Sequence, residues 1–281
     1  MIDPRGYLVT NFHVVENVDQ ITARGADANA YPAKIIAVDK RADLAVLKID
    51  ANKSFPYLSL NGAGGPIVGE TVIAIGNPYG LEDSVSIGIV SAVDRELPLP
   101  NGENFQGLIQ TDASINPGNS GGPLVTINGE LLGINVAIRS HAQGIAFAIP
   151  AARVRDIISG IMTNPSAVAD QGLAVEESVI IQAGGDVQGN GKSLAVRTVT
   201  AGSPAELAGF KQGDEILSVA DQSTSLRFDI ERAFWDRQPG ETISFKVKRD
   251  GEPTEVILTL GGKSSDEQLL WDTMGIRGRP V

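Results

Sequence analysis

The chain contains no cysteine, so disulfide bridges, cysteine nucleophiles and thiolate metal sites are all excluded. Histidine occurs only twice, at His13 and His141, which leaves two imidazoles for any acid–base chemistry. No apolar run approaches the roughly 20 residues of a membrane-spanning helix, and no signal peptide opens the chain. Nothing in the sequence therefore predicts a membrane span.

Basic residues are in deficit as well. The 23 Lys and Arg stand against 34 Asp and Glu, which gives a formal net charge of −11. An acidic surface repels phosphate backbones and anionic lipids, so nucleic acids and membrane surfaces are disfavoured as partners. Protein and peptide substrates remain compatible with this charge.

What the chain does contain is length, glycine and short apolar runs. Its 281 residues correspond to about two domains, each able to bury a core. Glycine (32) and proline (15) break the chain into short runs rich in Val, Ile and Leu, and no amphipathic segment between the early runs would make βαβ units. The sequence predicts a pair of β-barrels over the first part, with strands at 7–10, 33–38, 44–49, 71–75, 85–93, 124–127, 131–137 and 144–149.

A change of pattern marks the boundary between the two parts. Residues 151–159 are apolar at helical spacing and predict a helix that closes the first domain. From residue 171 a second unit begins, with strands at 172–176, 194–199, 215–219, 242–248 and 254–260 and helices starting near 204 and 228. Ser203 and Glu206 form a capping-box pattern at the first of these helices. The predicted division is 1–159, a linker at 160–170, a second domain at 171–262 and a tail at 263–281.

Both ends of the chain predict a fragment. The turn at 3–6 leads directly into the strand 7–10, as though the first strand or strands of the barrel were missing. The apolar segment 269–276 has nothing after it to pack against.

One glycine-rich turn carries the first chemical signal. Residues 116–123 place Ser120 among three glycines immediately before a predicted strand. Small residues let a carbonyl approach the backbone, and the N–H groups of Gly118 and Ser120 could converge on its oxygen as an oxyanion hole. A plain hairpin turn is the alternative reading.

A nucleophilic serine needs a base and a carboxylate that orients the base. His13 directly follows a strand, where a fixed backbone could aim the ring, whereas His141 lies in a polar stretch and is read as structural. Asp43 precedes a wholly apolar run, so its carboxylate needs a partner or serves as a turn cap. The chain order His13, Asp43, Ser120 is that of the trypsin-like double barrel.

Five motifs of the first domain resemble the protease domain of the HtrA/Deg family of serine endopeptidases. They are GYLVTNFHVV at 6–15, RADLAVLK at 41–48, GNPYG at 76–80, QTDASINPGNSGGP at 110–123 and GIAFAIP at 144–150. The resemblance implies a mainly β protein whose first domain is a trypsin-like double six-stranded β-barrel. It assigns His13 as general base, Asp43 as its orienter, Ser120 as nucleophile and the Gly118 and Ser120 amides as the oxyanion hole, with no metal or organic cofactor.

The same resemblance places the substrate. The strand of Asn135, Val136 and Ala137 would pair with the substrate backbone. Ile115 and Ile138 would line the pocket for the substrate residue that precedes the scissile bond. An apolar, branched lining suits small aliphatic side chains and offers no counter-charge to Lys or Arg. Cleavage after Val, Ala or similar residues is therefore predicted.

The second unit resembles a PDZ domain, most clearly over GSPAELAGFKQGDEILSV at 202–219. The resemblance implies a β-sandwich or partly open barrel with two helices that binds an extended peptide as an added strand. The loop Gly172, Leu173, Ala174 and Val175 would hold the terminal carboxylate, with Ala174 where the family usually has glycine. A purely structural role is the alternative, and the tail 263–281 weakly resembles the start of a further PDZ unit.

Together these resemblances imply an ATP-independent serine endopeptidase of protein quality control, located in the periplasm or cell envelope. Its partners would be unfolded proteins, C-terminal peptides at the PDZ unit and two further copies in a homotrimer, whose usual N-terminal contacts this chain lacks. The alternative is a noncatalytic, chaperone-like peptide binder in which an incomplete barrel misaligns the triad.

Overall fold

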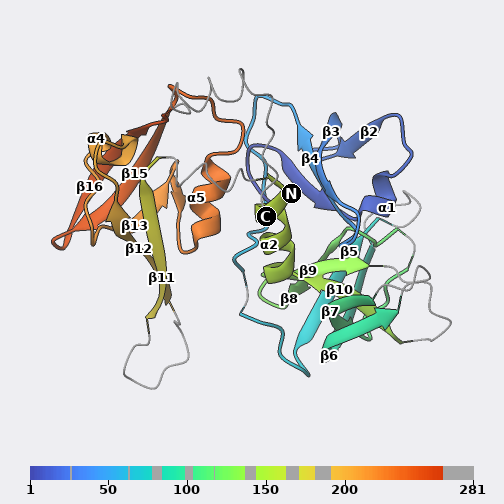
Figure 1. The fold of residues 1–281 in the computed structure, drawn as a ribbon. Helices are drawn as coiled ribbons and strands as arrows, with labels where there is room; N and C mark the ends of the chain where they lie inside the picture. The colour runs from blue at the N-terminus through green and yellow to red at the C-terminus, as the bar shows by residue number, and fades with distance from the viewer. Residues whose placement is uncertain are drawn as a thin grey trace. The chain divides into compact units, whose positions relative to one another are not determined.

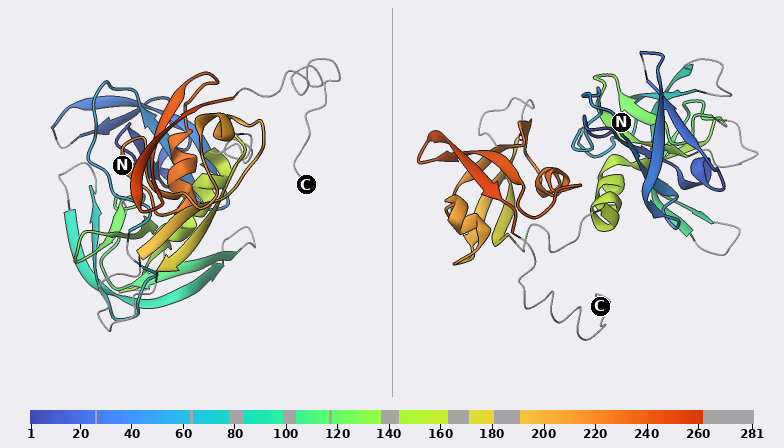
Figure 2. Two further views of the ribbon diagram at one scale, coloured as in Figure 1. Left: turned by 90° about the vertical axis from the view of Figure 1, so that its left-hand side faces the viewer. Right: turned by 90° about the horizontal axis from the view of Figure 1, so that it is seen from above.

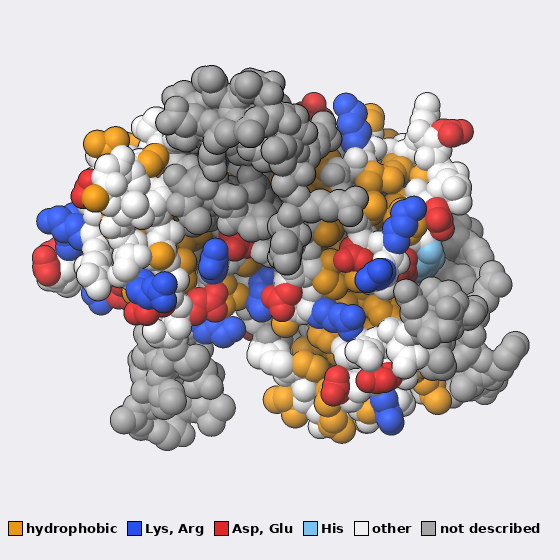
Figure 3. Space-filling model, viewed as in Figure 1, with side chains coloured by type: hydrophobic (Ala, Val, Ile, Leu, Met, Phe, Trp, Pro, Cys, Tyr) orange, Lys and Arg blue, Asp and Glu red, His pale blue; other side chains and the backbone are white. Residues whose placement is uncertain are grey.

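The computed structural model describes residues 1–25, 27–62, 64–77, 84–98, 104–116, 118–136, 144–162, 171–180 and 191–261. The chain divides into two units, Met1–Met162 and Thr163–Val281 (Figures 1 and 2). Both are built mainly from antiparallel strands, which confirms the expected mainly β class. Acidic and basic side chains are interspersed over the face drawn in Figure 3. None of the helices in the described ranges is both long and apolar enough to span a membrane.

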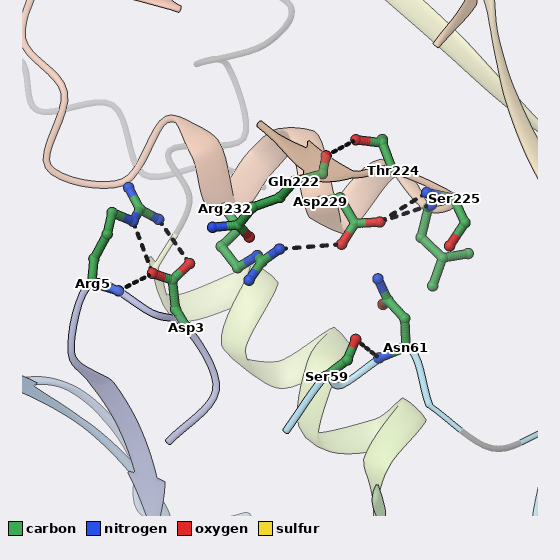
Figure 4. Close-up of polar contacts among 10 residues, drawn as sticks. Asp3, Arg5, Ser59, Asn61, Gln222, Thr224, Ser225, Asp229 and Arg232 are labelled. Atoms are coloured by element: carbon green, nitrogen blue, oxygen red, sulfur yellow. Dashed lines mark hydrogen bonds and ion pairs between the residues drawn. The ribbon is translucent and has the colours of Figure 1, made fainter. Parts of the chain in front are cut away.

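The first unit opens with a four-stranded antiparallel sheet and a short helix. The strands lie in the order β1-β4-β3-β2. Their bounds are β1 Tyr7–Thr10, β2 Ile21–Arg24, β3 Ala30–Asp39 and β4 Leu44–Ile49, and the helix α1 is Phe12–Val15. The apolar run of β4 forms the centre of the sheet, and its Leu47 and Ile49 pack with Val15 and Phe55 in one core cluster. Just before β1, Arg5 donates hydrogen bonds to the Asp3 carboxylate from Nε (2.9 Å) and Nη2 (3.1 Å), as Figure 4 shows.

The second half of this unit is a closed six-stranded barrel in the order β10-β7-β6-β5-β8-β9. Its strands are β5 Thr71–Gly76, β6 Ser84–Pro98, β7 Asn104–Thr111, β8 Pro123–Thr126, β9 Leu131–Val136 and β10 Ala146–Pro150. Alternate residues such as Val72 and Ala74 point inward and meet Leu124 in the barrel core. The helix α2 (Ala151–Met162) contacts β9 and β10.

The described residues of the second unit form an antiparallel sheet with two helices. The strands run β11-β12-β13-β15-β16, and β14 pairs with β13. Their bounds are β11 Leu173–Ile180, β12 Gly191–Val199, β13 Glu215–Val219, β14 Gln222–Ser223, β15 Thr242–Arg249 and β16 Glu252–Thr259. The helix α4 is Pro204–Ala208 and α5 is Arg227–Ala233. Asp229 caps α5 by accepting the N–H groups of Ser225 (3.0 Å) and Leu226 (3.1 Å), a contact drawn in Figure 4.

The structure corrects several predicted elements. The strands β2, β7 and β14 and the helix α1 were not predicted, because a two- to four-residue element shows no periodicity and β7 begins with polar residues. The closing helix ends at Met162, three residues beyond the predicted 159. At α4, Ser203 Oγ accepts the Glu206 N–H (3.2 Å) as the capping box requires, but the Glu206 carboxylate bonds the N–H of Gly202 instead of Ser203.

A buried ion pair in the second unit gives a stability prediction. Arg249 bonds both oxygens of the Asp214 carboxylate at 2.7 Å, and the Asp214 side chain is only 1% exposed. Burial alone would raise the pKa of Asp214, but the hydrogen bonds from Arg249 and the Lys211 N–H hold it below its ordinary value. Because Arg249→Met leaves this carboxylate buried and unpaired, it is expected to destabilise the unit by about 3 kcal/mol.

The matched control is Arg237→Met. Arg237 pairs with Glu241 at 3.1 Å, but both side chains are more than a third exposed, so the expected loss is below about 1 kcal/mol. Urea unfolding followed by tryptophan fluorescence measures both variants, since both tryptophans, Trp235 and Trp271, belong to the second unit. Equal losses would contradict the assignment of the Asp214–Arg249 pair as a structural core element.

Candidate active site

The most direct contact at the site joins His13 to Asp43. His13 lies in α1, one turn after β1, and Asp43 lies immediately before β4, the neighbour of β1 in the sheet. Asp43 Oδ2 is 2.6 Å from His13 Nδ1, and Asp43 Oδ1 accepts the main-chain N–H of His13 at 2.9 Å. The carboxylate therefore fixes both the ring and the backbone of the histidine. The structure brings these two predicted residues together.

This contact sets the protonation chemistry of the imidazole. The hydrogen bond that His13 donates to the Asp43 carboxylate raises the pKa of His13 above its ordinary value, with partial burial opposing this shift and the charges of Asp43 and Glu16 adding to it. With Nδ1–H directed at the carboxylate, the neutral ring carries its lone pair on Nε2. The His13 side chain is 46% exposed. An oriented, accessible imidazole of this kind can accept a proton from a nucleophile.

Ser120 lies in a tight turn between the barrel strands. The turn is closed by hydrogen bonds from Asn119 N–H to the Asn116 carbonyl (2.9 Å) and from Gly122 N–H to the Asn119 carbonyl (3.0 Å). Asn135 in β9 anchors it, because its carbonyl accepts the Gly121 N–H (2.9 Å) and its N–H donates to the Gly122 carbonyl (2.8 Å). The serine is thus carried by a turn fixed to a barrel strand.

Gly121 brings the turn that carries Ser120 (the serine turn) against residues 10–13, which carry His13 (the histidine segment). Its backbone lies so close to the end of β1 that a Cβ there would overlap the Thr10 hydroxyl oxygen and lie 3.0 Å from the Asn11 nitrogen. Thr10 and Asn11 directly precede the helix that carries His13. The barrel half and the sheet half of the first unit therefore meet where Gly121, the neighbour of Ser120, lies against Thr10 and Asn11.

The remaining predicted residues of this unit have different outcomes. Ile115 is half-buried and packs on the barrel core. Both main-chain groups of Asn135 are bonded to the serine turn, and the Val136 side chain is buried at the end of β9. Ala137, Ile138 and His141 lie outside the described residues. Gly118 is exposed and has a φ of +109°.

In the second unit the predicted carboxylate loop is mostly strand. Gly172 lies in a turn, and its carbonyl accepts the Thr200 N–H (2.8 Å). The backbone of Gly172 approaches Ser203 too closely to allow a Cβ. Leu173, Ala174 and Val175 belong to β11, with a bulge between the last two. β11 stands at one end of the sheet order and contacts α5, where Glu177 accepts the Arg227 N–H at 2.8 Å.

Two residues at the site were missed by the sequence reasoning. Asn11 donates its side-chain amide to the Asp43 carbonyl (3.0 Å), and Gly121 makes the close contact with β1. Asn11 stands two positions before the histidine in a helix-cap position, which is the only sequence signal it gives. In the described ranges, no cluster of three or more His, Asp or Glu side chains could hold a metal ion.

Two family models match the chain. The model described as a trypsin-like peptidase domain matches residues 1–134, and the PDZ domain model matches residues 182–260. These matches confirm the trypsin-like and PDZ assignments of the two units.

Curated relatives match over more than nine tenths of this chain. A probable periplasmic serine endoprotease DegP-like of Hahella chejuensis is 36% identical over 95% of this chain, and one of Chlamydia trachomatis is 37% identical over 92%. The chain spans 57% and 52% of the lengths of these two proteins.

Solved structures are similar as well. The HtrA-type protease AlgW with a tripeptide has a TM-score of 0.52 and 34% identity, covering 93% of this chain and 87% of that one. AlgW with a decapeptide has a TM-score of 0.51 and 32% identity, covering 93% of this chain and 81% of that one.

Proposed function

The chain belongs to the HtrA family of serine endoproteases, in which a trypsin-like peptidase domain is followed by a PDZ domain, and on this premise we propose that it is an ATP-independent serine endopeptidase that cleaves unfolded proteins. The observation that carries the proposal is the 2.6 Å contact between His13 and Asp43, with the Ser120 turn seated against the same segment. Protein quality control is the proposed role.

The proposed reaction proceeds through an acyl-enzyme. His13 Nε2 accepts the hydroxyl proton of Ser120 as Oγ attacks the scissile carbonyl, and the resulting tetrahedral intermediate places its oxyanion at the Gly118 and Ser120 N–H groups. His13 then donates the proton to the leaving amine, which leaves an ester on Ser120. Water hydrolyses this ester by the same route, with His13 again as base. No metal or organic cofactor takes part in the proposed steps.

Cleavage of casein by the purified chain tests the proposal. Casein is unfolded, so it needs no prior unfolding step. Cleavage is expected from the chain and not from Ser120→Ala, which controls for a contaminating protease. If well-folded chain leaves casein intact, the enzyme proposal fails and a noncatalytic peptide binder becomes the better account.

Substrate preference forms a second part of the proposal. We propose that Ile115 and Ile138 line the pocket before the scissile bond and that the substrate strand pairs from Val136 and Ala137 onward, since both main-chain groups of Asn135 already hold the serine turn. Peptides with Val or Ala immediately before the scissile bond should be cleaved with a kcat/KM at least ten times that of the peptide with Arg there. Comparable rates for Arg and Val would contradict the apolar pocket.

Peptide capture by the PDZ unit is the third part. We propose that a peptide with a free C-terminus adds to the edge of β11 beside α5, with its carboxylate at Gly172, Leu173, Ala174 and Val175. Fluorescence anisotropy should show binding of a labelled hydrophobic peptide, and amidation of its C-terminus should weaken binding at least tenfold. Equal affinity for the acid and the amide would remove the carboxylate site.

Location and assembly complete the proposal. The relatives' names place those proteins in the periplasm, and we propose the periplasm or cell envelope for this chain. A homotrimer is proposed from the family resemblance, and the sedimentation mass in solution would test it.

A further inference from the structure

Asn11 occupies the N-cap of α1, but its side chain does not form the hydrogen bond that usually caps a helix. It has the extended backbone of a cap residue (φ −71°, ψ 145°), but its side chain makes no bond to the helix. An asparagine there ordinarily accepts an N–H from the first turn. Here the N–H of His13 donates instead to Asp43 Oδ1 (2.9 Å), so the carboxylate caps the helix from 30 residues away.

The side chain of Asn11 is used across the sheet. Its Nδ2 donates to the main-chain carbonyl of Asp43 at 3.0 Å, and the Phe12 N–H donates to the same carbonyl at 3.0 Å. Asp43 has a φ of +52°, in the left-handed region that a non-glycine residue occupies only when its surroundings fix it. Two donors on its carbonyl provide that constraint. The carbonyl and both carboxylate oxygens of Asp43 thus all accept from residues 11–13.

Burial shows which half of the Asn11 amide matters. The residue is fully buried, and its Oδ1 has no hydrogen-bond partner within the described part of the chain. A buried amide oxygen without a partner costs free energy, which an apolar side chain of similar size would avoid. The donor Nδ2 is therefore the reason for an amide at this position.

We propose that Asn11 is a positioning residue: by holding the Asp43 carbonyl it fixes the direction in which the Asp43 carboxylate meets His13. The inference rests on the proposed function for its effect on catalysis, but the geometry it describes exists without turnover. Without Nδ2 the Asp43 peptide keeps one donor and can rotate, so the bond to His13 weakens. Loss of such a supporting contact is expected to lower kcat by about 10- to 100-fold with little change in KM.

The decisive experiment observes His13 directly by NMR in the inactive Ser120→Ala chain. Only two histidines contribute signals, and His141→Gln assigns them. The variant Asn11→Leu removes the donor while keeping the branching and the number of side-chain heavy atoms. The pKa of His13 should fall toward its ordinary value of about 6.5, and the low-field Nδ1–H resonance should weaken. Asp43 and Glu16, the acidic groups that act on His13, are unchanged in this variant.

A matched control separates positioning from stability. Thr126 is a buried polar residue of β8, a strand of the barrel and not of the four-stranded sheet beside His13, and its hydroxyl accepts the N–H groups of Asn128 and Glu130 at 3.3 Å. Thr126→Val should lower the unfolding temperature without moving the His13 pKa. In the active chain, Asn11→Leu should also move the acidic limb of kcat/KM to lower pH, which a loss of folded protein cannot do.

The outcomes are distinct. A folded Asn11→Leu chain with the His13 pKa and the Nδ1–H resonance unchanged would overturn the proposal. If Asn11→Leu does not fold, the smaller Asn11→Ala replaces it, and the same fall in the His13 pKa is expected. Absence of protease activity in the parent chain would instead overturn the proposed function and leave the NMR result readable.

Discussion

Asp43→Asn is expected to lower kcat by about 10⁴-fold while leaving KM within a few-fold of the parent value. The carboxylate accepts from both His13 Nδ1 (2.6 Å) and the His13 N–H (2.9 Å). An amide has only one acceptor oxygen, so it cannot satisfy both donors. If its oxygen keeps the main-chain N–H, its NH₂ group faces Nδ1 and forces the ring proton onto Nε2. Nε2 then cannot take the serine proton.

The same substitution reverses the shift in the pKa of His13. Asp43 raises that pKa first through its hydrogen bond and also through its charge. In the parent chain, cleavage should therefore increase with pH through a transition above about 6.5, because only the neutral ring acts as base. In Asp43→Asn the acidic limb of the residual activity should shift to lower pH. NMR titration of His13 in the Ser120→Ala background should show that its pKa falls in the same way.

Asp39→Asn is the matched control for this prediction. Asp39 ends β3, four residues before Asp43, and its Oδ1 accepts the N–H groups of Arg41 and Ala42 at 2.9 Å each. An amide oxygen can keep both bonds, and this side chain is not bonded to His13. Its kcat should stay within a few-fold of the parent. If Asp43→Asn also retains more than a tenth of the activity, Asp43 does not orient the base.

The residues of the proposed triad could be selected from the sequence because each lies in a recognisable local pattern. Ser120 lies in a glycine-rich turn, Asp43 precedes the buried run that forms β4, and His13 follows β1. Their order along the chain then limited the fold to one family of arrangements. The closing helix and most long strands were likewise visible, because their apolar periodicity extends over six or more residues.

The supporting contacts were invisible for an equally physical reason. The bond from Asn11 to the Asp43 carbonyl joins residues 32 positions apart and depends on a left-handed backbone at Asp43. No local pattern encodes a contact of that kind, since it arises only when β1 and β4 pair in their observed register. A strand was predicted at 172–176, but its continuation in β11 to Ile180 was not, because that part depends on pairing with β12 across the sheet.

Gly121→Ala is expected to destabilise the first unit by about 3 kcal/mol and to lower kcat/KM by more than about 100-fold. The φ of Gly121 is +78°, so any side chain there is strained, and its Cβ would in addition overlap the Thr10 hydroxyl. The turn must move away from β1 to relieve that overlap. Because Ser120 is the adjacent residue, the movement separates the nucleophile from the histidine segment.

Gly129→Ala isolates the strain from the overlap. Gly129 has the same φ of +78°, but a Cβ there meets nothing within 4 Å, so this variant should lose about 1 kcal/mol and keep its activity. The difference between the two variants then measures the contact between the serine turn and β1. Adding Thr10→Ala to Gly121→Ala removes the hydroxyl oxygen and should restore part of the activity, although the Asn11 nitrogen remains 3.0 Å from the new Cβ. If Gly121→Ala behaves like Gly129→Ala, the serine turn does not depend on β1, and the two halves of the unit must be aligned by other contacts.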